Sequence, residues 1–182
     1  GLIPVRTGPL GGRVDGGARH YVEKIVAGVE DKRLNTPVDS VRRDSQGVWI
    51  SSRGQTERFD QVVLACHSDQ SLALLRDASP AERATLGAIR YQPNLAVLHT
   101  DTTVLPRQRR AWAAWNYERA ADSTQEQSRV CLHYLLNLLQ PLPFTQSVVV
   151  SLNPVREIAP AQVLGSYSYD HPVFDLAAIQ AQ

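Results

Sequence analysis

The sequence predicts an α+β fold that joins an α/β-type first half to a β-rich second half. Residues 62–65 form a continuously apolar, mainly β-branched run, which is typical of a strand buried in a parallel sheet. Short stretches divided by turn residues precede this run, and such spacing favours antiparallel neighbours. Five more strand-like stretches follow residue 90. We therefore expect two domains, residues 1–89 and residues 90–182.

The first half begins with a Gly- and Pro-rich segment, residues 1–15, that is expected to be a loop. An amphipathic helix follows, because apolar residues recur at the helical spacing i, i+3, i+4 and i+7. These residues are Val22, Ile25, Val26 and Val29. A turn at residues 35–37 then leads into a strand that begins between Val38 and Val41.

A β-meander and two helices complete the first half. Turns at residues 44–47 and 53–55 enclose a strand at residues 48–52. After the buried run, Ser68 is expected to cap a helix that contains Leu72 and Leu75. The stretch Ser79-Pro80-Ala81-Glu82 then places Ser at N-cap, Pro at N1 and Glu at N3, which predicts the start of a second helix.

The second half is predicted to be mainly β-structure. The strand candidates are residues 94–100, 111–117, 130–135, 147–152 and 163–169. Residues 135–140 could instead form a short helix, and both alternatives remain open. Residues 174–182 predict a terminal helix. We expect the two halves to be an α/β-type lobe with a meander and a mixed or antiparallel sheet with helices.

Composition and charge exclude several classes of function. The 182 residues are 43% hydrophobic and 20% charged, as in ordinary globular proteins. Nineteen basic residues nearly balance eighteen acidic ones, so no nucleic-acid surface is expected. No apolar run reaches about 20 residues, which excludes a membrane span. The sequence contains no Met, so we expect either a longer parent polypeptide or a removed tag.

Four reactive residue types stand together in Cys66-His67-Ser68-Asp69. A Ser–His–Asp triad requires side chains that converge from different elements, and a nucleophile elbow requires flanking glycines that are missing here. Two other interpretations remain: a helix cap, or backbone beside a ligand at the carboxyl end of a parallel strand. The two cysteines, Cys66 and Cys131, form no disulfide framework and favour a reduced, cytoplasmic protein.

The sequence contains only weak signals for metal binding or phosphate binding. The five histidines show neither the i, i+4 spacing nor the Cys/His clustering of zinc sites, so no metal site is expected. The doublets Gly11-Gly12 and Gly16-Gly17 lie ahead of the first helix, where a phosphate could rest on free N–H groups. They could equally form a simple turn, because GxGxxG and GxxxxGK[ST] are both absent.

Aromatic residues gather in one predicted strand. Trp115 and Tyr117, at i and i+2, face the same side, while Trp112 and Asn116 face the other. This strand is either an aromatic wall beside a ligand cavity or an ordinary core strand.

The order of these parts resembles the flavin-dependent amine oxidase superfamily, which includes protoporphyrinogen oxidases and phytoene desaturases. In the first half the resemblance lies in GGARHYV (16–22), LNTPVDSV (34–41) and FDQVVLA (59–65). Later stretches are similar to a bacterial branch of amine-oxidase-like proteins with predicted NAD/FAD binding. They are LHTD (98–101), LPR (105–107), WAAWNY (112–117), LNP (152–154) and YDHPVF (169–174).

The resemblance implies an FAD-binding lobe followed by a substrate domain. It implies that backbone groups of Val38 bind the adenine end of FAD. Ala65 and Cys66 would border the ADP moiety, with Gly16 and Gly17 close to the cofactor. The sheet after about residue 90 would form a wall over the flavin, and Trp112, Trp115 and Tyr117 are its candidate substrate residues. The full enzyme would transfer a hydride from its substrate to FAD.

Three features of the family pattern are missing from these residues. They are the N-terminal GxGxxG fingerprint, the C-terminal Gly-rich flavin segment and an assignable catalytic Lys, since only Lys24 and Lys32 occur. We therefore expect the chain to be an internal fragment that binds FAD weakly or not at all by itself and is inactive alone. No catalytic residue can be assigned.

The expected partners are a small-molecule substrate and the remaining segments of the full-length chain, and a homodimer is left open. The alternative to a flavoenzyme is a stand-alone α+β module that binds a hydrophobic or aromatic ligand at the Trp112/Trp115 sheet without redox chemistry.

Overall fold

The computed structural model describes residues 18–118 and 131–181. The described residues form two compact units. The sheet unit contains residues up to Glu30 and Asn94–Tyr169, and the meander unit contains Asp31–Pro93 and the residues from Asp170 onward. Both units are discontinuous in sequence, and the predicted division after residue 89 stays a prediction.

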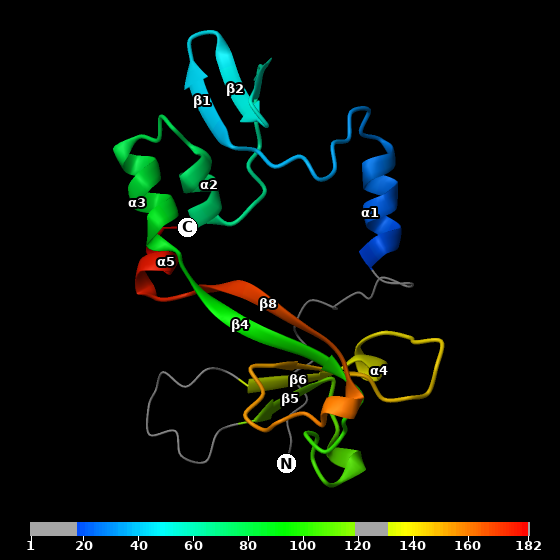
Figure 1. Cartoon of the computed structure of the whole chain (residues 1–182). Coiled ribbons are helices and arrows are strands. Elements are labelled where there is room, and N and C mark those ends of the chain that lie inside the picture. The colour runs from blue at the N-terminus through cyan, green and yellow to red at the C-terminus, as the bar shows by residue number, and fades with distance from the viewer. Residues whose placement is uncertain (1–17, 119–130, 182) are drawn as a thin grey trace, which may run out of the picture. The chain divides into compact units, whose positions relative to one another are not determined.

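The meander unit contains a three-stranded antiparallel sheet, confirming the predicted meander (Figure 1). Its strands are β1 (Ser40–Asp44), β2 (Gly47–Ser52) and β3 (Gln55–Phe59). The predicted turns join them, and Arg53 and Gly54 adopt the positive φ angles that the second turn requires. The pairings Val41↔Ile50 and Val48↔Phe59 fix the register.

Two helices pack beside β1, α2 (Ser68–Leu74) and α3 (Pro80–Ala88). The capping box of α3 is confirmed, because the Ser79 N–H donates to the Glu82 carboxylate (2.8 Å) and the Glu82 N–H donates to Ser79 Oγ (3.2 Å). The N-cap of α2 is His67, so the expectation that Ser68 is the cap was one residue off. A small apolar core joins helices and sheet: Val41, Val48, Leu75 and Ala78.

The expected buried strand at residues 62–65 is wrong for this structure. The segment is not a strand, Val63 is 88% exposed, and Ala65 is exposed as well. Its backbone makes no hydrogen bond to another described residue. An apolar run becomes a strand only when a neighbouring strand pairs with its N–H and C=O groups, and no described strand lies alongside this one.

The sheet unit contains all five strands predicted for the second half. They are β4 (Arg90–His99), β5 (Trp115–Glu118), β6 (Cys131–Leu135), β7 (Val149–Leu152) and β8 (Val163–Val173), in the order β5-β6-β7-β4-β8. The registers found for β5–β6, β6–β7 and β7–β4 are antiparallel. Strands β4 and β8 extend beyond this unit into residues of the other.

Short helices accompany the sheet. The ambiguous stretch after Leu135 forms α4 (Leu136–Leu139), and the predicted terminal helix is α5 (Leu176–Gln180). Two 3₁₀ turns, Arg109–Ala111 and Pro160–Gln162, lie in the connections. One face of the sheet is covered by an apolar core that consists of Val97, Val104, Leu105, Leu135, Val149 and Ile158.

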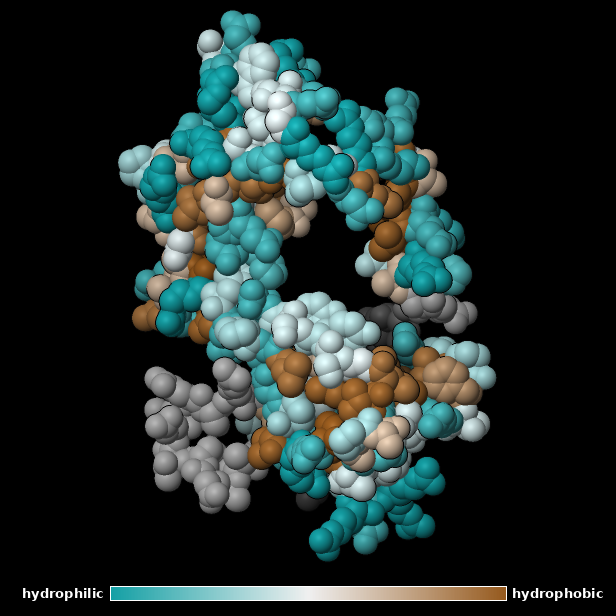
Figure 2. All heavy atoms as spheres, viewed as in Figure 1, coloured by the Kyte–Doolittle hydropathy of each residue, from teal (hydrophilic) through white to brown (hydrophobic). Residues whose placement is uncertain are grey.

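The predicted amphipathic helix is α1 (Ala18–Ala27). It ends before Val29, and its apolar residues remain uncovered, with Ile25 66% exposed. Figure 2 shows brown apolar atoms on this helix and in the region of β5, β6 and α4. Among the described helices, none has the length and apolar character needed to cross a membrane.

Arg43 links β1 to the end of α2 and the start of α3. Its guanidinium donates to Asp77 (2.7 Å) and Glu82 (2.6 Å). The hydrogen bond from Arg43, together with those from Ser79, lowers the pKa of Glu82 to about 2. Since the group is exposed, the ion pair orients the helices more than it stabilises the fold.

We expect the free energy of unfolding to fall in acid through Glu82. Its folded pKa lies below its ordinary value near 4.5, so its contribution is present above that pH and is lost as the pH falls towards about 2. Urea unfolding across this pH range should give a flatter dependence for Glu82→Gln than for the parent chain. The matched control Glu157→Gln, at an exposed carboxylate, should keep the parent's slope.

Candidate functional site

Val38, which is predicted to bind the adenine end of FAD, lines a pocket in the meander unit. The pocket has about 340 Å³ of free volume. Apolar side chains on its wall are Val38, Ile50 and Phe59, and its polar lining includes Arg33 and Glu57. Arg33 is held by the carboxylates of Asp31 and Glu57. The pocket therefore combines an apolar wall with a charged rim in which Arg33 is paired with two carboxylates.

The backbone of Val38 is available to a ligand. Asp39 donates to the Ser51 carbonyl and Pro37 accepts from Ser52 Oγ, so both neighbours are tied to β2. Within the described residues, no hydrogen bond uses the N–H or C=O of Val38 itself. Fixed neighbours with a free amide between them give a rigid donor and acceptor, as backbone recognition of a base edge requires.

The four reactive residues at 66–69 do not form a catalytic triad. Cys66 Sγ lies 3.2 Å from Ser71 Oγ, and the Ser68 N–H donates to the Tyr91 hydroxyl (3.0 Å). The His67 ring stacks on Tyr91, with centroids 4.4 Å apart. Asp69 accepts from the Gln70 N–H within the first turn of α2. The side chains serve the start of the helix instead of converging on one another.

Ala65 is the last residue of the segment 62–65, and Cys66 follows it towards α2. The preceding residues Gln61, Val62 and Leu64 line a pocket of about 730 Å³ against α2 and α3. Ala65 and Cys66 are themselves exposed. Their role beside the ADP moiety stays a prediction, as does that of Gly16 and Gly17, which lie outside the described residues.

Strand alternation in the sheet unit separates an aromatic face from a polar one. Trp115 and Tyr117 are 63% and 64% exposed and face the same way, as predicted. Cross-strand pairing sets Trp115 beside Tyr134 and Tyr117 beside Leu132. The Trp115 and Tyr134 rings meet edge to face, with centroids 5.5 Å apart. An exposed aromatic and apolar face results on β5 and β6.

Trp112 does not belong to this face. The expected strand over residues 111–117 begins only at Trp115, because residues 109–111 form a 3₁₀ turn. Trp112 follows the turn, packs against the apolar core and donates from Nε1 to the Pro106 carbonyl (2.8 Å). The prediction that the three aromatic residues share one strand is therefore wrong, since the turn redirects the chain.

The opposite face carries a buried polar chain that sequence analysis did not identify. Ser151 Oγ on β7 lies 2.7 Å from His99 Nε2 and 2.6 Å from His133 Nδ1. His133 Nε2 lies 2.9 Å from Glu118 Oε2, and Arg156 donates to Glu118 Oε1 (2.8 Å). His99, His133 and Ser151 are at most 1% exposed. Four strands thus contribute to one hydrogen-bonded chain.

Burial controls the electrostatics of this chain. Desolvation lowers the pKa of His99, opposed by the nearby Asp101 carboxylate, so this imidazole is neutral at pH 7. Burial would raise the pKa of Glu118, but hydrogen bonds from His133 and Arg156 hold it below its ordinary value. Burial raises the pKa of the Cys131 thiol, whose sulfur lies 3.5 Å from His133 Nε2.

Comparison with known families places the chain. The family model for flavin-containing amine oxidoreductases matches residues 5–124, and the chain belongs to that family. No curated protein matches the sequence.

The solved structures support the fold independently. The chain is similar to a CLA-producing fatty acid isomerase from P. acnes, with a TM-score of 0.55 and 13% sequence identity. The likeness covers 84% of this chain but 39% of that protein. At this identity the comparison shows the fold, a mixed α+β arrangement as predicted.

We expect the buried chain of hydrogen bonds to depend on Ser151, which contacts both His99 and His133. Ser151→Ala leaves two imidazole nitrogens without their shared partner, so the free energy of unfolding should fall by about 1–3 kcal/mol. Urea denaturation measures this loss. Ser147→Ala, at a half-buried position just before β7, is the matched control and should change stability little. Equal effects of the two substitutions would contradict the role of Ser151.

Proposed function

We propose that this chain supplies part of the FAD site and the substrate-binding sheet of a flavin-dependent oxidoreductase. The observation that carries the proposal is the Val38 pocket, where a free backbone amide and carbonyl border an apolar wall and an anchored Arg33. Membership of the flavin-containing amine oxidoreductase family supports FAD as the ligand. In this proposal Val38 binds the adenine edge, and Ala65, Cys66, Gly16 and Gly17 border the rest of the nucleotide.

The proposed substrate is apolar and lies on the face formed by Trp115 and Tyr117. Aromatic side chains offer large contact areas with little loss of conformational entropy, which suits a hydrophobic substrate. Leu132 and Tyr134 on β6 extend the same face. The structurally similar protein from P. acnes is named for a fatty acid, which supports an acyl chain as the substrate class. Trp112, packed against the core, is left out of this surface.

Hydride transfer in the full enzyme is assigned to the cofactor. When bound, the flavin supplies the redox chemistry, and the chain's residues bind and orient the substrate. Lys24 and Lys32 are the only lysines, the first on α1 and the second just after it, and neither is assigned to the chemistry.

Nucleotide binding tests the cofactor half of the proposal. In ¹⁵N-resolved NMR titrations, ADP and FAD at millimolar concentration should shift the amides of Val38, Ala65 and Cys66, whereas FMN, which lacks adenosine, should not. Val38→Asp should weaken the shifts, because it places a carboxylate on the apolar wall against which the adenine would lie. Val155→Asp, at an exposed site in the sheet unit, should preserve them. Shifts caused equally by FMN, or absent from these amides with FAD, contradict the proposal.

Oleate binding tests the substrate half. Tyr117→Ala should weaken oleate binding measured by calorimetry, because it removes an exposed ring from the aromatic face. Tyr167→Ala is the control, since Tyr167 is an exposed residue of β8 at the other edge of the sheet. Oleate binding with no response to FAD or ADP favours the alternative, a ligand-binding module without redox chemistry. Equal affinity of both variants contradicts the assigned face.

A further inference from the structure

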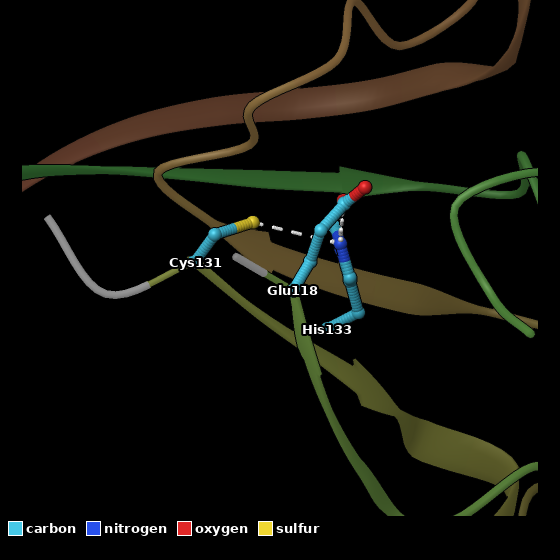
Figure 3. Close-up of side chains that lie close together, drawn as sticks. All are labelled: Glu118, Cys131 and His133. Carbon is cyan, nitrogen blue, oxygen red and sulfur yellow. Dashed lines mark hydrogen bonds and ion pairs between the residues drawn. The ribbon is translucent and has the colours of Figure 1, made fainter. Parts of the chain in front are cut away.

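Three potential metal ligands converge beside the buried polar chain. Glu118, Cys131 and His133 each offer one ligand atom, and all three atoms lie within 4.8 Å of one another (Figure 3). Glu118 ends β5 and pairs directly with Cys131 at the start of β6, while His133 follows two residues later on the same face. Strand register and alternation therefore bring the three side chains to one point.

Two of the three separations between ligand atoms are close to those around a tetrahedral zinc ion. With about 2.3 Å to sulfur and about 2.0–2.1 Å to nitrogen or oxygen, tetrahedral geometry places sulfur about 3.6 Å from nitrogen and oxygen about 3.4 Å from nitrogen. Cys131 Sγ lies 3.5 Å from His133 Nε2, already at the required separation. Glu118 Oε2 lies 2.9 Å from the same nitrogen, so the carboxylate needs to retreat by about 0.5 Å.

The surrounding hydrogen bonds already orient the ligands. His133 Nδ1 lies 2.6 Å from Ser151 Oγ, which leaves Nε2 directed at the other two ligands. Arg156 binds Oε1 of Glu118 and leaves Oε2 to face His133. Such outer contacts fix the ring and carboxylate orientation in protein metal sites.

Charge balance also fits a divalent cation. A thiolate and a carboxylate would neutralise the ion, and Cys131 is 1% exposed, where a net charge would be costly. Arg156 opposes a cation, yet its other nitrogens donate to the Thr103 and Val104 carbonyls, so it remains outside the ligand set. Burial raises the pKa of Cys131, so binding must also displace the thiol proton.

A small pocket lies beside two of the three potential ligands. Glu118 and His133 line a pocket of about 200 Å³ together with Asn116, Tyr117 and Arg156. Three protein ligands and one open position are the arrangement of zinc sites that also bind water or a ligand, in contrast to closed structural sites with four protein ligands.

We propose that Glu118, Cys131 and His133 form a zinc site with one open coordination position. The mixed sulfur, nitrogen and oxygen ligand set favours Zn²⁺ over Ca²⁺ or Mg²⁺, which prefer oxygen ligands alone. The site joins β5 to β6.

Metal titration of the complete, chelator-treated chain tests the proposal. Calorimetry with Zn²⁺ should show one site per chain. Co²⁺, which takes the same ligands, should give visible bands of a tetrahedral ion and a thiolate charge-transfer band. Cys131→Ser and Glu118→Gln should each weaken Zn²⁺ binding by more than the roughly 10–100-fold associated with loss of a second-shell partner. Cys66→Ser, which removes the other thiol, is the matched control and should leave binding unchanged.

Circular dichroism of each variant separates loss of a ligand from loss of the fold. Glu118 is partly exposed, so Glu118→Gln keeps the comparison valid if Cys131→Ser unfolds the chain. Measuring the Co²⁺ charge-transfer band in the parent chain and in Cys66→Ser tests the site without replacing any of its ligands. Absence of Zn²⁺ binding, loss of that band in Cys66→Ser, or unchanged affinity in folded Cys131→Ser or Glu118→Gln each overturns the proposal.

Discussion

The direct pairing of His133 with Ser151 across β6 and β7 is the constraint on which the sheet unit depends. It sets a fully buried hydroxyl between two imidazoles, and these polar groups tolerate burial only while they bond to one another. A register shift of one residue would turn every side chain to the other face and leave them unpaired. The register of β5 on β6 likewise places Glu118 beside Cys131 and keeps Trp115 and Tyr117 on the open side.

Alternation along β5 and β6 therefore builds two different surfaces from one pair of strands. The open face is aromatic and apolar, and the proposal places a hydrophobic substrate there. The covered face carries both the apolar core and the buried polar chain that leads to Glu118, Cys131 and His133. Tyr117 and Glu118 are adjacent in sequence and both line the small pocket beside this cluster. A metal ion at the covered face would thus lie next to the strand that carries the proposed substrate surface.

The meander unit depends on backbone pairing in a different way. Its three strands pair with one another, while residues 61–65 form no backbone hydrogen bond to any other described residue and Val63 is exposed. An apolar run of this kind is typical of a buried parallel strand, but pairing is a property of the neighbour as much as of the segment. The free groups of Val38 and the exposed residues Ala65 and Cys66 lie in the same unit, where the proposal places the nucleotide.

Local patterns in the sequence determined most of the elements. The capping box at Ser79 fixed the start of α3, turn residues fixed the meander, and β-rich stretches located all five later strands. They also placed Trp115 and Tyr117 on one face, because side-chain direction follows from strand periodicity. Tertiary structure alone decided what depends on partners. Within the part of the chain that the structure describes, it left residues 62–65 without a pairing strand and packed Trp112 against the core. It also brought Glu118 to Cys131 and His133 through a cross-strand register that no local spacing encodes.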